Sequence, residues 1–444
     1  MEKIRSGQTF LYRKNGLNCT VLDVRMKQKI RGDYLQMAYV KALQRFPYMA
    51  KKLVEIDGDF YLEENPLSMT IAKTDKTRQL GSMSTNYHLI DITYFENSFC
   101  VAFHHALCDG RGIKPFLETL IYYYCCLRYN KKLDSSGIRL AGEPLLPGET
   151  DEPVGESMFD VDKANLPQII KDGYRLPENE EVCVCYYRYE LLIDKSGFIK
   201  YMKDHEATPA ILLALLVSDS IYSIHPDADK PIVCSLAVDY RNEIGLENTH
   251  KNCVGSLYLP FTEETRKMSV AEQARYYREL MKEQRKPDAI KNMINTQIGL
   301  CERLDQLPSL EEKRLALDFF NDMCIDTYVI SYLGQIELGD REVYVDSIHL
   351  YNSGVQGLRI SVISAGDYFS VNIKQDFESE EIVASLKKTL DDIDIAYSAS
   401  ERIRFATLKD MAYVTAGRQA ERYRRILNKG KAVINAGKRQ EAKT

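Results

Sequence analysis

Tryptophan is absent from this chain of 444 residues, and so are long apolar runs. No stretch reaches the roughly 20 apolar residues that a membrane-spanning helix needs. The segment from Met1 to Phe10 also lacks the apolar run of a secretory signal. We therefore expect a cytoplasmic protein without a transmembrane segment. Hydrophobic residues make up 45% of the chain and charged residues 28%, a balance typical of globular proteins.

Positive charge is not in excess, because the formal net charge is -5. A protein that binds nucleic acid needs a basic face, so we expect no nucleic-acid partner. The charge is unevenly placed, however, and the stretch from about Ser398 onward predicts a helix rich in Arg and Lys. This stretch is either a solvated basic tail or a patch for an anionic partner, such as a phosphate-bearing cofactor or a membrane surface.

A disulfide framework is missing as well. The eleven cysteines are an odd number without framework spacing. Cys125 and Cys126 are adjacent, and Cys183 and Cys185 are separated by one residue, which is too close for a mutual disulfide or a zinc knuckle. We interpret the cysteines as reduced and mostly buried thiols.

Strand-like and helix-like segments alternate along most of the chain. Clusters of β-branched and aromatic residues predict strands over 20–24, 99–103, 182–193, 231–238, 328–331, 358–364 and 368–375. Apolar residues at helical spacing predict helices over 35–46, beyond Gly112, over 208–216, 271–284 and 310–323. Asp57-Gly58 predicts the turn of a hairpin.

The length of the chain exceeds what one hydrophobic core usually reaches. Residues between about Ser135 and Glu181 are rich in Gly, Pro and acidic residues with weak periodicity, which is typical of a long connection. We expect a first half over residues 1–150, a linker over 151–181, a second half over 182–398 and a basic tail over 399–444. Each half mixes strands and helices, which predicts an α/β fold (α+β, two layers) with a site in the cleft between the halves.

One segment stands far above the background. His104 and His105 follow an apolar strand, and Asp109 and Gly110 come just before a helix. The chain has only seven histidines, so chance is a poor explanation for an adjacent pair in this setting. An imidazole at the end of a strand can face a cleft, and its near-neutral pKa suits the removal of a proton from a hydroxyl or an amine.

Other interpretations of this segment are weaker. His104 is expected to be a buried, hydrogen-bonded neighbour, because adjacent residues of an extended segment point to opposite faces. A metal site built from His104, His105, Cys108 and Asp109 would need two consecutive histidines to converge on one ion, and no second ligand cluster is visible. A serine nucleophile would call for a Gly-x-Ser-x-Gly elbow, which the sequence does not contain.

The segment resembles the His-His-x-x-x-Asp-Gly signature of the chloramphenicol-acetyltransferase-like superfamily of acyltransferases. Alcohol acetyltransferases and the condensation domains of nonribosomal peptide synthetases belong to it, and this chain is most similar to that branch. The resemblance extends from about residue 5 to 398 and includes Arg45-Phe46-Pro47 near the start. The Asp-Phe-Gly-Trp-Gly sequence of plant relatives is missing, which argues against the plant branch.

The resemblance implies a role for each motif residue. His105 would be the catalytic base, while His104, Asp109 and Gly110 would be structural, and Asp109 would pair with Arg241 of the second half. A strand containing Ser331 and Gly334 would contribute groups that contact the substrate or the oxyanion. Tyr332 stands where the family usually has Asn, which is a departure from the pattern.

The resemblance also implies a fold and an activity. The fold would be two acetyltransferase-like subdomains forming a pseudo-dimer around a central cleft or tunnel. The activity would be direct acyl transfer from acyl-CoA, or from a phosphopantetheine thioester on a carrier protein, to the hydroxyl or amine of a small molecule. No tightly bound cofactor, nicotinamide or metal is expected, and we expect a monomer. A free-standing condensation domain and a non-catalytic binding module of the same fold are the alternatives.

Overall fold

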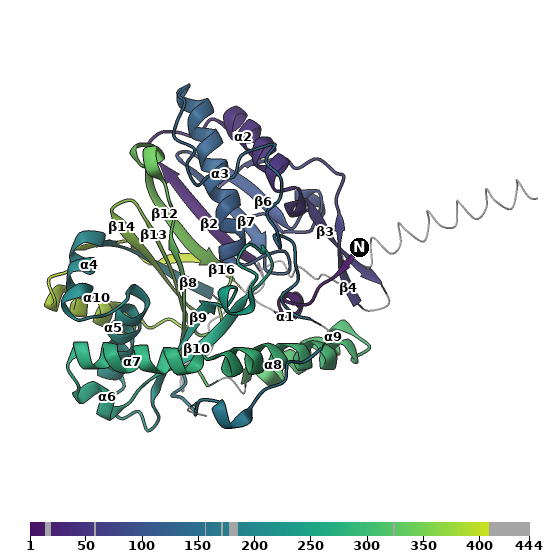
Figure 1. Cartoon of the computed structure of the whole chain (residues 1–444). Helices are drawn as coiled ribbons and strands as arrows, with labels where there is room; N and C mark the ends of the chain where they lie inside the picture. Colours follow the sequence, from purple (N-terminus) through teal and green to yellow (C-terminus); the bar gives the residue numbers. More distant parts are fainter. Residues whose placement is uncertain are drawn as a thin grey trace, which may run out of the picture.

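The structure is a computed structural model, which describes residues 1–13, 19–56, 59–155, 157–169, 172–176, 185–322 and 325–407. The described strands form three sheets, and helices cover their outer faces (Figure 1). Two large apolar clusters make up most of the core, one in each half of the chain. The mixed fold expected from the sequence is confirmed.

A five-stranded sheet carries the histidine pair. Its strands lie in the order β12, β2, β7, β6, β5. Their bounds are β2 (Cys19–Met26), β5 (Ala72–Lys73), β6 (Ile90–Phe95), β7 (Ser98–His104) and β12 (Val345–Asn352). The helices α2 (Gly32–Arg45) and α3 (Gly110–Tyr129) pack on each other and on this sheet. Strand β7 therefore ends at the motif, and α3 begins directly after it.

A small sheet lies beside the first one, with β4 between β1 and β3. Its strands are β1 (Glu2–Lys3), β3 (Lys51–Ile56) and β4 (Asp59–Glu64). Strands β3 and β4 form the hairpin that Asp57-Gly58 predicts, although these two residues themselves lie outside the described part of the chain.

The second half forms the largest sheet, in the order β10, β9, β11, β13, β14, β8, β15, with β16 also paired to β8. Its strands are β8 (Cys185–Asp194), β9 (Ile232–Asp239), β10 (Val254–Phe261), β11 (Tyr328–Gln335), β13 (Leu358–Ala365), β14 (Tyr368–Gln375), β15 (Tyr397–Ala399) and β16 (Ile403–Thr407). Strands β9, β11 and β13 are parallel neighbours, and the other pairs are antiparallel.

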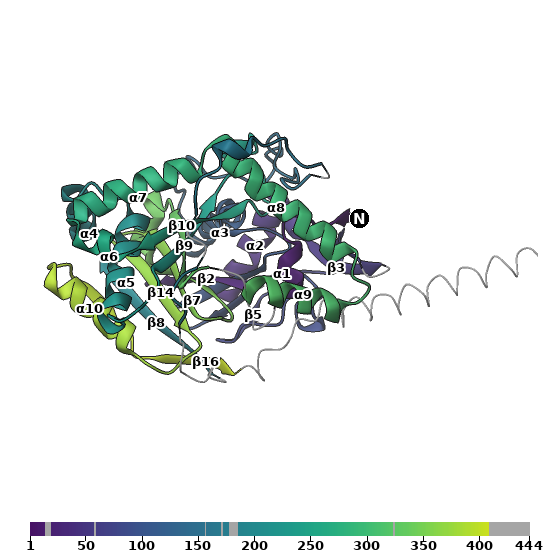
Figure 2. The same cartoon turned by 90° about the horizontal axis from the view of Figure 1, so that it is seen from below.

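The remaining helices are α1 (Gln8–Tyr12), α4 (Lys195–Asp204), α5 (Pro209–Ile224), α6 (Glu263–Lys267), α7 (Val270–Gln284), α8 (Pro287–Asp305), α9 (Leu310–Asp322) and α10 (Glu381–Asp392). Helices α7, α8 and α9 follow one another along the lower edge of the molecule in Figure 1, and Figure 2 shows the same edge from below. Leu304 of α8 and Leu317 of α9 reach the core of the first half. This edge therefore ties the two halves together.

Strand β12 crosses between the halves. Its residues belong to the second half of the sequence, but it pairs with β2 of the first sheet, with Asn352 opposite Thr20. The sequence pattern did not predict this strand. A strand that adds to the edge of a distant sheet has a partner that periodicity alone cannot identify.

The prediction of a helix from about Ser398 is wrong for the described residues. Residues 397–399 and 403–407 form β15 and β16, which pair with β8. Sheet hydrogen bonds offered by the edge of β8 outweigh local helix preference here, since tertiary context overrides propensity. The basic stretch beyond residue 407 lies outside the described part of the chain.

In the described chain, no individual helix is both long and apolar enough to cross a membrane. Helices α4 and α5 reach that length and hydropathy only when taken together, across a bend of 88°.

Candidate active site

The turn between β7 and α3 positions the motif residues. Asp109 caps α3, because its side chain accepts a hydrogen bond from the backbone N–H of Gly112 at 2.7 Å. His104 is buried, with 1% of its surface exposed, and its Nδ1 accepts from the N–H of Ala106 at 2.9 Å. His104 thus has the buried, hydrogen-bonded position that the sequence predicts for it.

His105 lies on the wall of a cavity and is only partly exposed. Its ring stacks on that of Phe10 of α1, with 4.2 Å between the ring centroids and 18° between the planes. Its Nε2 lies 2.9 Å from Oγ1 of Thr20. Burial, assisted by the positive charge of Arg13, lowers the pKa of His105 to about 3. The imidazole is therefore neutral at physiological pH, as a general base must be.

The two ring nitrogens of His105 differ in their surroundings. Nδ1 is shielded from solvent and has no hydrogen-bond partner within the described residues. Nε2 lies next to Thr20, which itself borders the cavity. Nε2 is therefore the nitrogen that a substrate in the cavity can reach.

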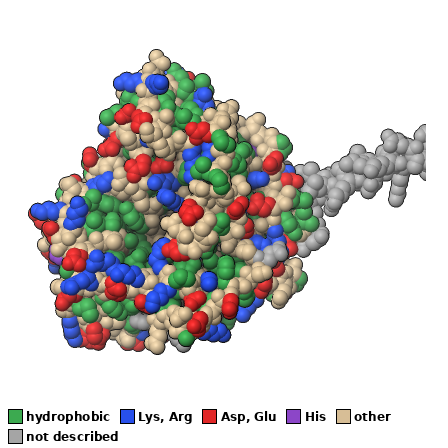
Figure 3. Space-filling model, viewed as in Figure 1, with side chains coloured by type: hydrophobic (Ala, Val, Ile, Leu, Met, Phe, Trp, Pro, Cys, Tyr) green, Lys and Arg blue, Asp and Glu red, His purple; other side chains and the backbone are tan. Residues whose placement is uncertain are grey.

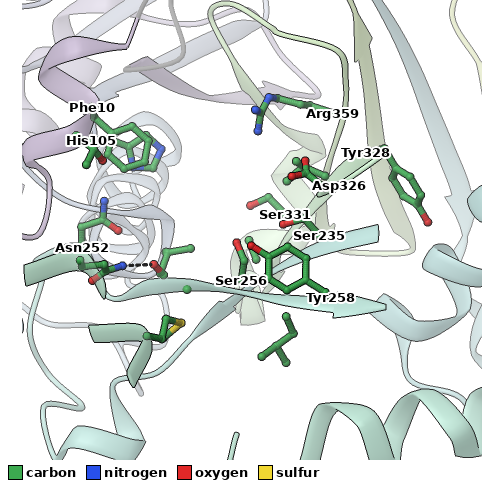
Figure 4. Close-up of a pocket in the computed structure, with 18 of the residues that line it drawn as sticks. Phe10, His105, Ser235, Asn252, Ser256, Tyr258, Asp326, Tyr328, Ser331 and Arg359 are labelled. Atoms are coloured by element: carbon green, nitrogen blue, oxygen red, sulfur yellow. Dashed lines mark hydrogen bonds between the residues drawn. The ribbon is translucent and has the colours of Figure 1, made fainter. Parts of the chain in front are cut away.

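The cavity has a volume of about 860 Å³ and is lined by both halves of the chain. Figure 4 shows Phe10 and His105 on one wall, with Asp326, Tyr328 and Arg359 on the opposite wall. Hydroxyl groups lie between them: Ser235, Ser256, Tyr258 and Ser331. The cavity thus has a neutral imidazole on one wall and polar groups on the other. Its volume suits a small-molecule substrate.

Arginine outnumbers acidic residues among the described residues that line this cavity. Four arginines, Arg5, Arg13, Arg175 and Arg359, face two aspartates, Asp326 and Asp376. The face of the molecule seen in Figure 3 shows no such bias, because it carries charges of both signs with hydrophobic patches between them. The excess positive charge inside the cavity favours a ligand that carries negative charge.

Asp109 and Arg241 form a buried ion pair that joins the two halves. Arg241 Nη2 donates to Asp109 Oδ1 at 2.7 Å, and the two side chains are 1% and 0% exposed. The other oxygen of Asp109 accepts from the backbone N–H of Cys253 at 2.8 Å. Burial would lower the pKa of Arg241, but the Asp109 carboxylate reverses this effect and raises it. The structure thus brings together the pair that the resemblance implies.

Asp239 and Arg111 are nearby in the sequence and could compete for Arg241 and Asp109, respectively. Asp239 also accepts a hydrogen bond from Arg241, through Nη1 at 2.8 Å, so Arg241 serves two carboxylates. Backbone carbonyls of Thr249 and Lys251 accept from the same guanidinium. Arg111 is exposed on the first turn of α3. Four hydrogen bonds from its guanidinium explain how Arg241 can be buried.

The structure places Ser331 and Gly334, the residues predicted to contact the substrate, in different surroundings. Ser331 of β11 and Gly110 border the cavity, whereas Gly334 is not among the described residues that line it. Gly334 adopts a positive φ of 91° where the pairing of β11 with β13 is irregular. A side chain on Gly110 would bring its Cβ within 2.9 Å of Leu333 Cδ1. Gly110 therefore leaves room for the side chain of Leu333, which also lines the cavity.

Sequence patterns missed two residues that contact His105. Phe10 comes from a helix of five residues, too short to show a periodicity. Thr20 is the second residue of β2, which pairs with β7 so that Thr20 lies opposite Phe103 and beside the histidine pair. The pairing of β2 with β7 was not predictable from local sequence, and it alone makes Thr20 a neighbour of His105.

The five histidines outside the motif fall into two groups. His88, His250 and His349 are buried, whereas His205 and His225 do cap helices α4 and α5. His349 lies where β12 packs on the largest sheet, and Ser370 Oγ is 2.9 Å from its Nδ1. Burial is the largest cause that lowers the pKa of His250 and of His349 to about 3.

These buried neutral histidines predict a loss of stability in acid. Below the ordinary pKa of 6.5 the unfolded chain binds protons that the folded chain does not, so the stability present above pH 6.5 falls as the pH falls. Each such histidine contributes a slope of about 1.4 kcal/mol per pH unit. Urea unfolding of the His349→Gln variant between pH 7 and 4 should show a shallower loss than the wild type. Parallel curves would contradict this account of His349.

Comparison with known proteins gives matches only at the level of structure. No family model and no curated protein matches the sequence. The trichothecene 15-O-acetyltransferase TRI3 of Fusarium sporotrichioides has a TM-score of 0.57 at 13% identity, over 88% of this chain and 94% of that one. TRI101 of F. graminearum, solved with coenzyme A and T-2 mycotoxin, has 0.54 at 12%, over 89% and 99%.

A condensation domain is similar to the same extent. The domain from the monacolin K polyketide synthase MokA has a TM-score of 0.53 at 12% identity, over 88% of this chain and 96% of that domain. Almost the full length of each of these three proteins is covered, so the likeness concerns the whole architecture. This chain therefore has the chloramphenicol-acetyltransferase-like fold shared by such acetyltransferases and condensation domains.

Proposed function

We propose that this protein is an acyltransferase that moves an acyl group from a CoA thioester to a hydroxyl or amine of a small molecule, with His105 as general base. The observation that carries the proposal is a neutral imidazole whose Nε2 borders a cavity lined by both halves. Solved proteins of this fold include acetyltransferases, one of them in complex with coenzyme A. The four arginines of the cavity suit a donor that carries phosphates.

The proposed reaction is a direct transfer. Nε2 of His105 takes the proton of the acceptor hydroxyl while the acceptor oxygen forms a bond to the thioester carbonyl carbon. When the tetrahedral intermediate collapses, the carbon–sulfur bond breaks and the imidazolium returns the proton to the leaving thiolate. The carbonyl oxygen becomes negatively charged in between and needs a donor. The hydroxyl of Ser331, which borders the cavity, is the candidate side chain for this role.

A thiol-release assay tests the proposal. Purified protein is incubated with acetyl-CoA or longer acyl-CoAs and with pooled alcohols and amines, and free CoA is followed with a thiol reagent. The chain has cysteines of its own, so the His105→Ala protein provides the blank. We expect release that depends on both an acceptor and His105.

A second set of donors separates the alternatives. Acyl groups on phosphopantetheine of a carrier protein replace acyl-CoA in otherwise identical reactions. Transfer from the carrier protein alone would identify a condensation-type enzyme and would contradict the CoA donor. Absence of His105-dependent transfer from every donor would contradict the proposed enzyme and leave a binding module of the same fold.

A further inference from the structure

Thr20 connects His105 to the second half of the chain. Its Oγ1 lies 2.9 Å from His105 Nε2 and accepts a hydrogen bond from Nδ2 of Asn352, also at 2.9 Å. Thr20 is on β2 and Asn352 ends β12, so the two residues are directly opposite each other in the antiparallel pair. All three side chains border the cavity.

Asn352 is itself held in place by a buried lysine. The side-chain amino group of Lys374, on β14, donates to the backbone carbonyls of Asn352 and Gly354. Lys374 is 1% exposed, so these bonds form away from water, where they are strong. The end of β12 is therefore fixed against the largest sheet, which holds the Asn352 amide in place beside Thr20.

The donors limit the directions that these hydrogen bonds can take. A threonine hydroxyl has one proton and two lone pairs. Asn352 Nδ2–H occupies one lone pair of Thr20 Oγ1, which leaves the hydroxyl proton and the second lone pair for the contact with Nε2 of His105. If the hydroxyl donates, the lone pair of Nε2 accepts the bond and the ring proton resides on Nδ1; if Nε2 donates, the ring proton resides on Nε2. Only the first arrangement leaves Nε2 basic, as general-base catalysis requires.

We propose that Thr20, oriented by Asn352, is a positioning residue that holds His105 in the tautomer with the basic lone pair on Nε2. The proposal rests on the proposed function, in which Nε2 is the base. Stacking on Phe10 restricts the plane of the ring, and the bond to Thr20 fixes its rotation within that plane. An arriving acceptor hydroxyl replaces the Thr20 hydroxyl at Nε2. Thr20 can then rotate its proton away and accept the Nε2–H of the imidazolium.

Kinetics of matched variants test this role. Thr20→Val keeps the shape but removes the hydroxyl, and we expect kcat to fall roughly tenfold to a hundredfold, the value of a hydrogen bond to a group that becomes charged. The KM values should change less than about threefold, because the substitution does not alter contacts that bind substrate and transition state equally. Thr20→Ser should recover most of kcat. Thr93→Val, a buried threonine of β6 that does not border the cavity, is the control for loss of a hydroxyl.

The double variant tests whether Asn352 acts through Thr20. Asn352→Leu should lower kcat in the wild-type background but have little further effect in the Thr20→Val background. An undiminished kcat in Thr20→Val would overturn the proposal, and so would equal losses from Asn352→Leu in both backgrounds. Thermal unfolding of each variant shows whether it is folded.

A nuclear magnetic resonance experiment tests the tautomer without any substrate. Long-range proton–nitrogen spectra of protein with ¹⁵N-labelled histidine distinguish the two neutral tautomers, and the His105→Ala spectrum identifies the His105 signals. We expect the pattern with the proton on Nδ1, and its loss or mixing in Thr20→Val. A proton on Nε2 in the wild type would overturn the inference. This result is independent of whether acyl transfer is found, so failure of the proposed function is distinguishable from failure of the positioning role.

Discussion

Replacing His105 with alanine is expected to remove most of the acyl-transfer activity while the protein stays folded. A positioned general base typically contributes a factor of about 10² to 10⁴ to the rate. His105 is the residue in this cavity with a neutral imidazole, and its removal leaves space rather than an unpaired charge. The measurement is kcat with the best donor and acceptor from the thiol-release assay, together with a thermal unfolding curve.

His205→Ala is the matched control for this variant. His205 ends α4 and stacks on Tyr201, at 4.1 Å between ring centroids, and it does not border the cavity. Its replacement should leave kcat close to the wild-type value. A folded His105→Ala protein that transfers acyl groups at nearly the wild-type rate would refute the role of His105 as base.

Removing the charge of Arg241 is expected to cost about 3–5 kcal/mol of stability, because Asp109 is left buried and uncompensated. Removing the charge of Asp109 also costs stability, because Arg241 loses its buried partner and keeps only the more exposed Asp239. Asp109→Asn is preferred to alanine, since the amide oxygen can still cap α3 at Gly112. Arg241→Met removes the guanidinium but keeps an apolar stem. The double variant should cost less than the sum of the single ones, with a coupling between about 0.5 and 3 kcal/mol.

The free energies of unfolding in urea, measured for the four proteins of this cycle, give the coupling. Asp109→Asn combined with Arg78→Gln provides the control, because Arg78 pairs with Asp91 and not with Asp109. That combination should be additive. Additivity for Asp109 and Arg241 as well would mean that the pair does not act as a unit. Asp239, which also bonds to Arg241, is expected to reduce the cost of Asp109→Asn relative to Arg241→Met.

The position of His105 follows from two strong local signals in the motif. An apolar strand ends at His104, and Asp109 is a good helix cap just before an amphipathic helix, so the turn between them was predictable. The pairing of Asp109 with Arg241 came instead from the family resemblance. Local pattern alone contains no information on which distant cation neutralises a given carboxylate.

The sequence by itself determined the alternation of strands and helices and the place of the histidine pair between a strand and a helix, since each depends on residues that are close in the chain. Only the tertiary structure decided that β12 joins the first sheet and that β15 and β16 replace a predicted helix. Strand partners far apart in sequence are chosen by the sheet edges available in the folded chain. The contact of Thr20 with His105 and that of Asn352 with Thr20 exist for that reason.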